Sequence, residues 1–274
     1  MKKKIYSTIV TLMILSGLSL LLYPTASDYL NNISRAKDIS TYAESVAHTD
    51  KDKYQRMWDE AVDYNSRLAQ MPTHWRLGEK EKAEYSQILN VSGTGIMSYV
   101  EIPKLNCSLP VYHSTDTDVL QIAIGHLEGS SLPVGGRSTH CVLSGHRGLP
   151  SAKLFTSLDK LVEGDTFSIR TLDETLSYEV DKISIVLPEE TELLQIVPGK
   201  DLCTLMTCTP YGVNSHRLLV RGHRIEDTKA IEMRVTADAL QIDPMMVAPV
   251  LAMPVVIILF IVVITHKKNK KTDF

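Results

Sequence analysis

The sequence predicts a mainly β domain that follows a helical region and lies between two apolar segments. The β part consists of short runs rich in apolar and β-branched residues, separated by glycine and proline at near-regular intervals. This pattern is typical of a sandwich or barrel. Residues 31–70 contain neither proline nor glycine and repeat apolar residues at helical spacing, which predicts helix.

Two long uncharged runs, residues 5–27 and 244–265, predict a membrane helix at each end of the chain. Each run is long enough to cross a bilayer of about 30 Å. Lysines precede the first run and follow the second, and basic flanks stay cytoplasmic. We therefore expect both termini in the cytoplasm and residues 28–243 outside the plasma membrane. The alternative for the first run is a cleaved signal peptide ending near Thr25-Ala-Ser27, but its apolar core is longer than such peptides carry.

Composition excludes some functions and leaves others open. The 274-residue chain has a net charge of -3, so nothing in its overall charge indicates a nucleic-acid partner.

The sequence Met71-Pro72-Thr-His74-Trp75 interrupts the helical region just before the β domain. Pro72, His74 and Trp75 are therefore candidates for a lid loop over a cleft.

The expected elements of the β domain follow from local patterns of alternation and breaks. A short helix is expected at residues 116–124 and a turn-rich loop at 126–136. The expected strands are 97–102, 108–112, 138–144, 166–170, 175–180, 182–186, 202–207 and 217–220.

Cys208 is the candidate nucleophile because it ends a buried strand beside a loop. Pro210 cannot continue a hydrogen-bonded ladder, and Gly212 favours a turn, so the strand ends near Cys208. Arg217 begins the return strand and supplies a cation close to the thiol. Such a cation favours the thiolate, although a lone strand cysteine is more often a packing residue.

His146 is the candidate acid and base. It lies at the corner where the strand Val142-Leu-Ser144 enters the Gly-flanked turn Gly145-His-Arg-Gly148. A cysteine nucleophile with a histidine distant in sequence is the arrangement expected of thiol catalysis. Neighbouring polar residues are candidates to line the cleft: Ser144, Thr207 and Thr209.

The other histidines and cysteines predict neither a metal site nor a disulfide framework. His126, His140, His216 and His223 show no close ligand spacing with one another or with the cysteines, so we expect no metal and no cofactor. Cysteines are sparse for a domain of this size, which favours free thiols. The three cysteines expected to be structural are Cys107, Cys141 and Cys203.

Two longer motifs resemble one family. The run Gly145-His146-Arg-Gly-Leu-Pro-Ser-Ala-Lys-Leu-Phe155 and the run Thr207-Cys208-Thr-Pro-Tyr-Gly-Val-Asn-Ser-His-Arg217 are similar to those of sortases, specifically the class C, pilin-polymerising branch of Gram-positive bacteria. The resemblance implies an eight-stranded β-barrel, with Cys208 as nucleophile, His146 as acid/base and Arg217 as the cation at the substrate carbonyl. The chain departs from class C in lacking the usual Asp-Pro-aromatic lid anchor, for which Pro72-Thr-His-Trp75 is the nearest substitute.

The resemblance also implies the reaction and its partners. A sortase of this branch cleaves a Leu-Pro-x-Thr-Gly-like sorting signal between Thr and Gly, then joins the acyl group to a lysine of another pilin subunit. Two alternatives stay open: a housekeeping sortase whose amine is a peptidoglycan precursor, and a non-catalytic membrane scaffold with paired cysteines.

The expected domains are a basic tail 1–4, membrane helix 5–27, helical region with lid loop 28–94, catalytic barrel 95–225, connector 226–244, membrane helix 245–265 and basic tail 266–274.

Overall fold

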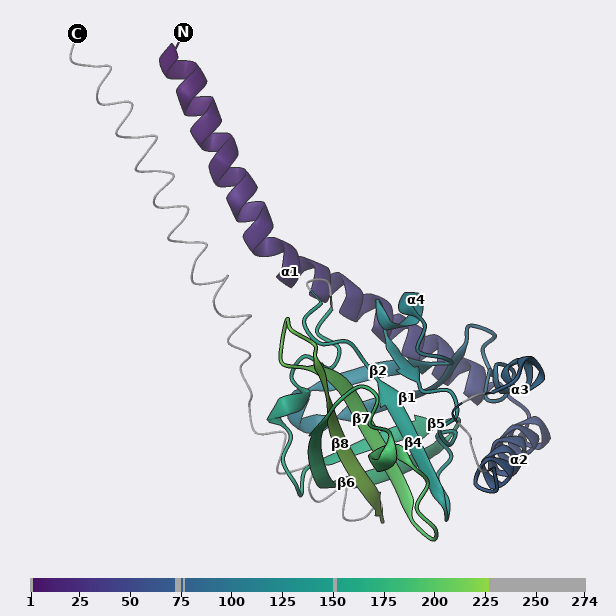
Figure 1. Ribbon diagram of the computed structural model, residues 1–274. Helices are drawn as coiled ribbons and strands as arrows, with labels where there is room; N and C mark the ends of the chain where they lie inside the picture. The colour runs from purple at the N-terminus through teal and green to yellow at the C-terminus, as the bar shows by residue number, and fades with distance from the viewer. Residues whose placement is uncertain (1, 72–74, 76, 150–151, 227–274) are drawn as a thin grey trace. The chain divides into compact units, whose positions relative to one another are not determined.

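The computed structural model describes residues 2–71, 75, 77–149 and 152–226 (Figure 1). The described residues from 28 onward form one compact unit, and residues 2–27 belong to a second unit. The second apolar run at 245–265, the tail at 266–274 and all but the first residue of the connector lie outside the described residues.

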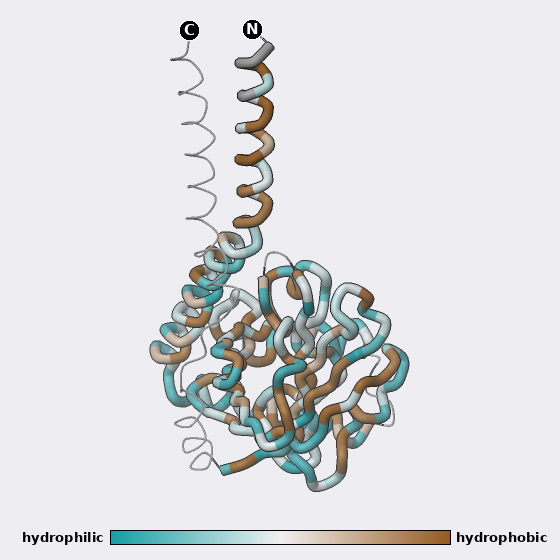
Figure 2. Tube along the Cα trace, turned by 90° about the vertical axis from the view of Figure 1, so that its left-hand side faces the viewer, coloured by the Kyte–Doolittle hydropathy of each residue, from teal (hydrophilic) through white to brown (hydrophobic). Residues whose placement is uncertain are grey.

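Helix α1, Lys2–Ala47, contains the first apolar run. Large apolar side chains are exposed along this run, among them Met13 at 69% and Leu20 at 73%, and Figure 2 shows its predominantly hydrophobic colouring. Among the described residues, α1 is the helix long and apolar enough to cross a membrane. Exposed apolar side chains on such a helix suit a lipid environment, which fits membrane anchoring by the N-terminal helix.

The region of residues 31–70, predicted to be helical, is interrupted once. Helix α1 ends at Ala47, and α2 begins at Lys51 and ends at Leu68. His48 Nδ1 lies 2.7 Å from the Glu44 carbonyl oxygen, and Thr49 Oγ1 donates to the Ser45 carbonyl at 2.7 Å. Polar side chains that bond the last carbonyls of a helix compete with its continuation, so the break needs neither proline nor glycine.

A closed barrel of eight strands forms the domain, in the spatial order β1-β2-β3-β4-β7-β8-β6-β5. The pairs β2–β3 and β4–β7 are parallel and the remaining neighbours antiparallel, so the barrel is mixed. The strands are β1 Ile96–Ile102, β2 Cys107–Tyr112, β3 Ile124–His126, β4 Thr139–Ser144, β5 Thr166–Thr171, β6 Glu174–Val186, β7 Asp201–Thr209 and β8 His216–Ile225. The short helices are α3 Glu79–Tyr85, α4 Thr117–Leu120, and three 3-10 turns at Pro103–Leu105, Leu158–Lys160 and Glu192–Leu194.

Two strand predictions needed correction. The predicted strands 175–180 and 182–186 form the single strand β6, whose pairing with β8 shifts register between Val180 and Lys182. Asp181 lies at this irregularity, and its carboxylate accepts bonds of 2.9 and 3.0 Å from the Arg221 guanidinium. An inserted residue of this kind bends a strand without ending it. The second correction is β3, a three-residue strand that reaches His126, the first residue of the predicted loop.

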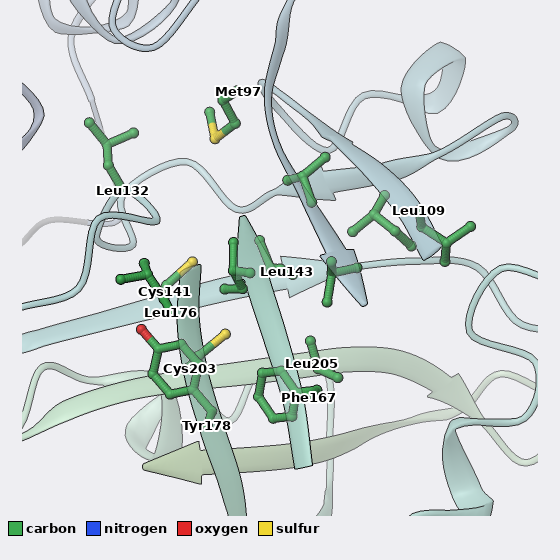
Figure 3. Packing of buried hydrophobic residues seen from close by; sticks show 14 of the residues in the cluster. Met97, Leu109, Leu132, Cys141, Leu143, Phe167, Leu176, Tyr178, Cys203 and Leu205 are labelled. Carbon is green, nitrogen blue, oxygen red and sulfur yellow. The ribbon is translucent and has the colours of Figure 1, made fainter. Parts of the chain in front are cut away.

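The barrel interior is filled by apolar side chains from all around the sheet. Figure 3 shows this packing, with Leu143, Phe167, Tyr178 and Leu205 among the labelled residues. The rings of Phe167 and Tyr178 stack with centroids 5.5 Å apart. Gly222 lies beside them, where an added Cβ would approach the Phe167 ring to 2.9 Å. The close packing fixes the relative positions of the strand ends that carry the candidate site.

Candidate active site

Cys208 and Arg217 lie side by side on the outer face of the barrel. The antiparallel register of β7 and β8 pairs Cys208 directly with Arg217. Leu205 and Thr207 on β7, and Leu218 on β8, are buried, so strand alternation turns Cys208 and Arg217 outward. Directly opposed residues of an antiparallel pair have Cβ atoms about 5 Å apart. Both side chains are partly exposed, as a group that meets a substrate must be.

His146 enters the same region from β4. This strand runs parallel to β7, and Ser144 pairs with Met206. Beyond the strand, the Gly145 N–H donates to the Met206 carbonyl at 3.0 Å, and Thr207 Oγ1 donates to the Gly145 carbonyl at 2.7 Å. These two bonds hold the backbone just before His146 against β7, next to the strand position of Cys208. The structure therefore brings the three predicted catalytic residues to the ends of adjacent strands.

Gly145 allows this approach because it has no side chain. A Cβ at this position would lie 2.5 Å from the Ile124 side chain and 2.8 Å from the Phe155 ring. The Phe155 N–H also donates to the His146 carbonyl at 3.2 Å, so the buried Phe155 supports the histidine loop from the barrel core. Sequence reasoning assigned no role to Phe155, because a contact across the loop has no local pattern.

The loop after His146 is bonded to the end of β7. Arg147 donates from Nη2 to Asp159 at 2.6 Å and from Nη1 to Thr209 Oγ1 at 3.3 Å. Gly148 has a φ of +83°, and a Cβ there would lie 2.9 Å from the ring of Tyr211. The β7–β8 loop thus contacts the histidine loop, and the two loops flank the candidate residues.

The predicted cleft residues take different places. Ser144 is partly exposed at the end of β4. Thr207, which was expected to line the cleft, is instead buried at 1% exposure and bonded to Gly145, because alternation turns it opposite to Cys208. Thr209 is also buried, at 8%, and accepts the bond from Arg147. Thr207 therefore holds the backbone of the histidine loop, and Thr209 holds the Arg147 side chain. Both threonines have structural contacts in place of the predicted position along the cleft.

Arg217 is held by backbone carbonyls at the base of the β7–β8 loop. Its Nη1 donates to the Asn214 carbonyl at 3.3 Å and to the His216 carbonyl at 3.2 Å. A guanidinium carries five N–H donors, so this anchoring leaves donors for a substrate carbonyl. The group can therefore stabilise negative charge that develops on an oxygen near Cys208.

Trp75 packs against the same outer face. It contacts a small apolar cluster built on Val142, Leu194 and Leu219, with Met206 beside it. Met206 and Leu219 are each two residues from Cys208 and Arg217 respectively, hence on the same face of their strands. Pro72 and His74, the other lid candidates, lie outside the described residues.

All four cysteines are free thiols in the structure. Cys141 and Cys203 are paired positions on β4 and β7 and are buried, and burial raises the pKa of Cys203 well above its ordinary value. Burial also raises the pKa of Cys107 to about 12, which keeps that thiol protonated and unreactive at neutral pH.

The buried histidines have structural partners. His126 Nδ1 lies 2.9 Å from the Tyr85 hydroxyl, and its Nε2 lies 2.9 Å from the Ser131 carbonyl. His140 contacts the Gln195 carbonyl and Thr204 Oγ1, each at 2.8 Å. Within the described ranges, no group of three or more His, Cys, Asp or Glu side chains is arranged to hold a metal ion.

Comparison with known proteins identifies the family to which this barrel is similar. A sortase domain model matches residues 100–225. The crystal structure of sortase C1 from Streptococcus agalactiae is 50% identical, covers 69% of this chain and 98% of its own, and superposes with a TM-score of 0.68. Sortase C of Streptococcus pneumoniae is 44% identical, with coverages of 69% and 97% and a TM-score of 0.64. Sortase D of Bacillus subtilis is 28% identical over 179 residues, which is 60% of this chain and 87% of that protein.

A mixed eight-stranded barrel with these matches defines a cysteine transpeptidase of the sortase fold. The chain belongs to the sortase family, in its class C branch.

Proposed function

We propose that this protein is a membrane-tethered transpeptidase that joins pilin subunits, with Cys208, His146 and Arg217 as its catalytic residues. The observation that carries the assignment of residues is the Cys208–Arg217 cross-strand pair with the His146 loop bonded to the same strand. The choice of pilin as substrate is supported by the similar Streptococcus pneumoniae sortase C, whose structure is described in terms of pilin substrate specificity.

The first half of the reaction forms a thioester. The Cys208 thiolate attacks the carbonyl carbon of Thr in a Leu-Pro-x-Thr-Gly-like signal, and Arg217 donates hydrogen bonds to the resulting oxyanion. The Thr–Gly bond then breaks. Protonated His146 gives its proton to the departing glycine amine, which leaves with the C-terminal part of the substrate.

The second half transfers the acyl group. The side-chain amine of a lysine on another pilin subunit attacks the thioester carbonyl, and the bond to Cys208 Sγ breaks. His146 takes the proton released by the lysine nitrogen, so thiolate and imidazolium are regenerated. The product is an isopeptide bond, and no oxidant or reductant is consumed.

The membrane arrangement completes the proposal. The N-terminal apolar helix is retained as an anchor, and the run at 245–265 forms a second membrane helix. Lysines at both ends keep the termini in the cytoplasm, which places residues 28–243 outside. The enzyme then meets pilins as they emerge from the same membrane. We assign Pro72, His74 and Trp75 as a lid, and the packing of Trp75 on the face that carries Cys208 supports this assignment.

The test is incubation of the full chain in detergent with pilin subunits that carry the sorting signal, followed by mass spectrometry of the cross-linked species. We expect a lysine isopeptide bond to the signal threonine, absent with Cys208→Ala. Adding a peptidoglycan-precursor amine to the same reaction distinguishes the housekeeping alternative. Preferential transfer to that amine would refute pilin joining, and cross-linking by folded Cys208→Ala would refute the nucleophile.

A further inference from the structure

Asp28 is a buried acidic residue to which the mechanism above assigns no role. It lies on α1 directly after the apolar run and is 7% exposed. Its Oδ1 accepts the backbone N–H of Lys153 at 3.0 Å. Three weaker contacts surround the same carboxylate: Arg35 Nη2 at 3.5 Å, Asn32 Nδ2 at 3.5 Å and Lys153 Nζ at 3.9 Å.

The Lys153 contact reaches the loop that bears His146. Two residues after Lys153, the Phe155 N–H donates to the His146 carbonyl at 3.2 Å. One residue further, Thr156 Oγ1 accepts the Gly148 N–H at 3.1 Å. These bonds join the two ends of the loop, at residues 146–148 and 155–156, and Asp28 is bonded to Lys153 just before the second end. A displacement of Lys153 would therefore move the segment that supports the His146 backbone.

A purely structural ion pair with Arg35 is the simpler explanation of Asp28. The two residues are seven apart, on one face of α1, and Arg35 is 5% exposed. However, the bond to Lys153 is shorter than the approach of Arg35, and Arg35 Nε and Nη1 have no hydrogen-bond partner among the described residues. A pair that served the helix alone would satisfy its buried cation, because an unpaired buried donor is costly. The carboxylate is instead directed at the loop.

We propose that Asp28 is a positioning residue, which holds the loop that presents His146 to Cys208. The inference rests on the proposed role of His146. Asp28 acts through the Lys153 backbone and does not touch the substrate, so its loss should affect the chemical step more than substrate binding.

The test compares kcat and KM of full-length variants in detergent, with a Leu-Pro-x-Thr-Gly peptide and an acceptor amine. Misplacing a catalytic group by about 1 Å costs about 10²-fold in rate. We expect Asp28→Ala to lower kcat by about 10- to 100-fold and to change KM less than about three-fold. Asp28→Asn keeps an oxygen that can accept the Lys153 N–H, so it should recover most of the lost kcat.

Tyr42→Phe is the matched control. Tyr42 lies on the same helix, donates to the Met97 carbonyl at 3.0 Å and accepts the Leu172 N–H at 2.7 Å, away from the histidine loop. It should lower the unfolding temperature and leave kcat near that of the wild type. If Asp28→Ala fails to fold, Asp28→Ala/Arg35→Met replaces it, because removing both charges leaves neither unpaired, and the same loss of kcat is expected.

Three outcomes would overturn the role of Asp28: wild-type kcat in folded Asp28→Ala or the double variant, an equal kcat loss in Tyr42→Phe, or no recovery with Asn. His146→Ala is measured alongside. If that variant keeps wild-type kcat, the proposed catalytic site itself fails. If it is inactive while Asp28→Ala is fully active, only the positioning role fails.

Discussion

Cys208 and Arg217 are direct partners across β7 and β8, one pair away from the last pair before the connecting loop. The register continues without irregularity from the pair of Leu202 with His223 to the pair of Thr209 with His216. Moving the Arg217 backbone away from Cys208 would therefore require every pair of this ladder to slip, which would turn buried side chains outward. The barrel core thus fixes the backbone positions from which the candidate nucleophile and cation extend.

Arg217→Lys should lower kcat by about 10²-fold, because a compact ammonium cannot reproduce the fork of donors directed at an oxyanion. The measurement is steady-state transpeptidation with a sorting-signal peptide. Arg221→Lys is the control, since Arg221 lies four residues along the same face and is bonded to Asp181. A kcat for Arg217→Lys equal to that of Arg221→Lys would contradict an oxyanion role.

His146→Ala should lower kcat by about 10²- to 10⁴-fold with little change in stability, because it removes an acid/base group at a loop corner. His140→Ala should do the reverse. It leaves Thr204 and the Gln195 carbonyl without their buried partner, at a cost of about 1–3 kcal/mol. Urea unfolding and kcat of both variants check the contrast, and substantial catalysis by folded His146→Ala would rule out its role.

Trp75→Ala should raise the rate at which Cys208 is alkylated by about ten-fold, equivalent to about 1.4 kcal/mol of lid closure. Trp75 packs against the apolar cluster of Val142, Leu194 and Leu219 on the face that carries Cys208, so truncating it should expose that face. Trp58→Ala is the control, because Trp58 packs against the main core instead. Alkylation is followed by mass spectrometry with a small iodoacetamide. An unchanged rate would show that Trp75 does not act as a lid.

Four sulfhydryls should be titrated per chain under denaturing, non-reducing conditions, because all four cysteines are free thiols. In the native protein Cys208 should react first, since Cys141 and Cys203 are buried and burial raises the pKa of Cys107 to about 12. Peptide mapping after timed alkylation gives the order. Finding two disulfides would instead support a non-catalytic scaffold.

The folded protein should lose stability as pH rises above about 9–10. Burial raises the pKa of Tyr64 and of Tyr112 from 10.0 to about 12, and that of Cys107 from 9.0 to about 12. Between these values the unfolded chain releases protons that the folded chain keeps, so the free energy of unfolding falls with pH. Urea titrations at pH 8 and 10.5 measure this fall. Tyr64→Phe should make it shallower, and an identical slope in that variant would contradict the assignment.

Local patterns were sufficient to predict the candidate catalytic residues as residue types at strand ends. Pro210 and Gly212 mark the end of β7, and the glycines around His146 mark a corner after β4. The prediction of two strands where β6 is one failed because a bulge at Asp181 resembles a strand break in sequence. Its continuity depends on the partner strand β8, which lies more than 30 residues further along the chain.

The sequence by itself determined the apolar N-terminal helix, the β character of the domain and the identities of Cys208, His146 and Arg217 as candidates, because these depend on composition and on neighbours along the chain. Tertiary structure alone decided that Cys208 opposes Arg217, that Thr207 faces inward to hold Gly145, and that Asp28 reaches Lys153. Strand register sets the first two contacts, and the position of α1 against the loop after β4 sets the third, which joins residues 125 positions apart. No local pattern encodes such a distance.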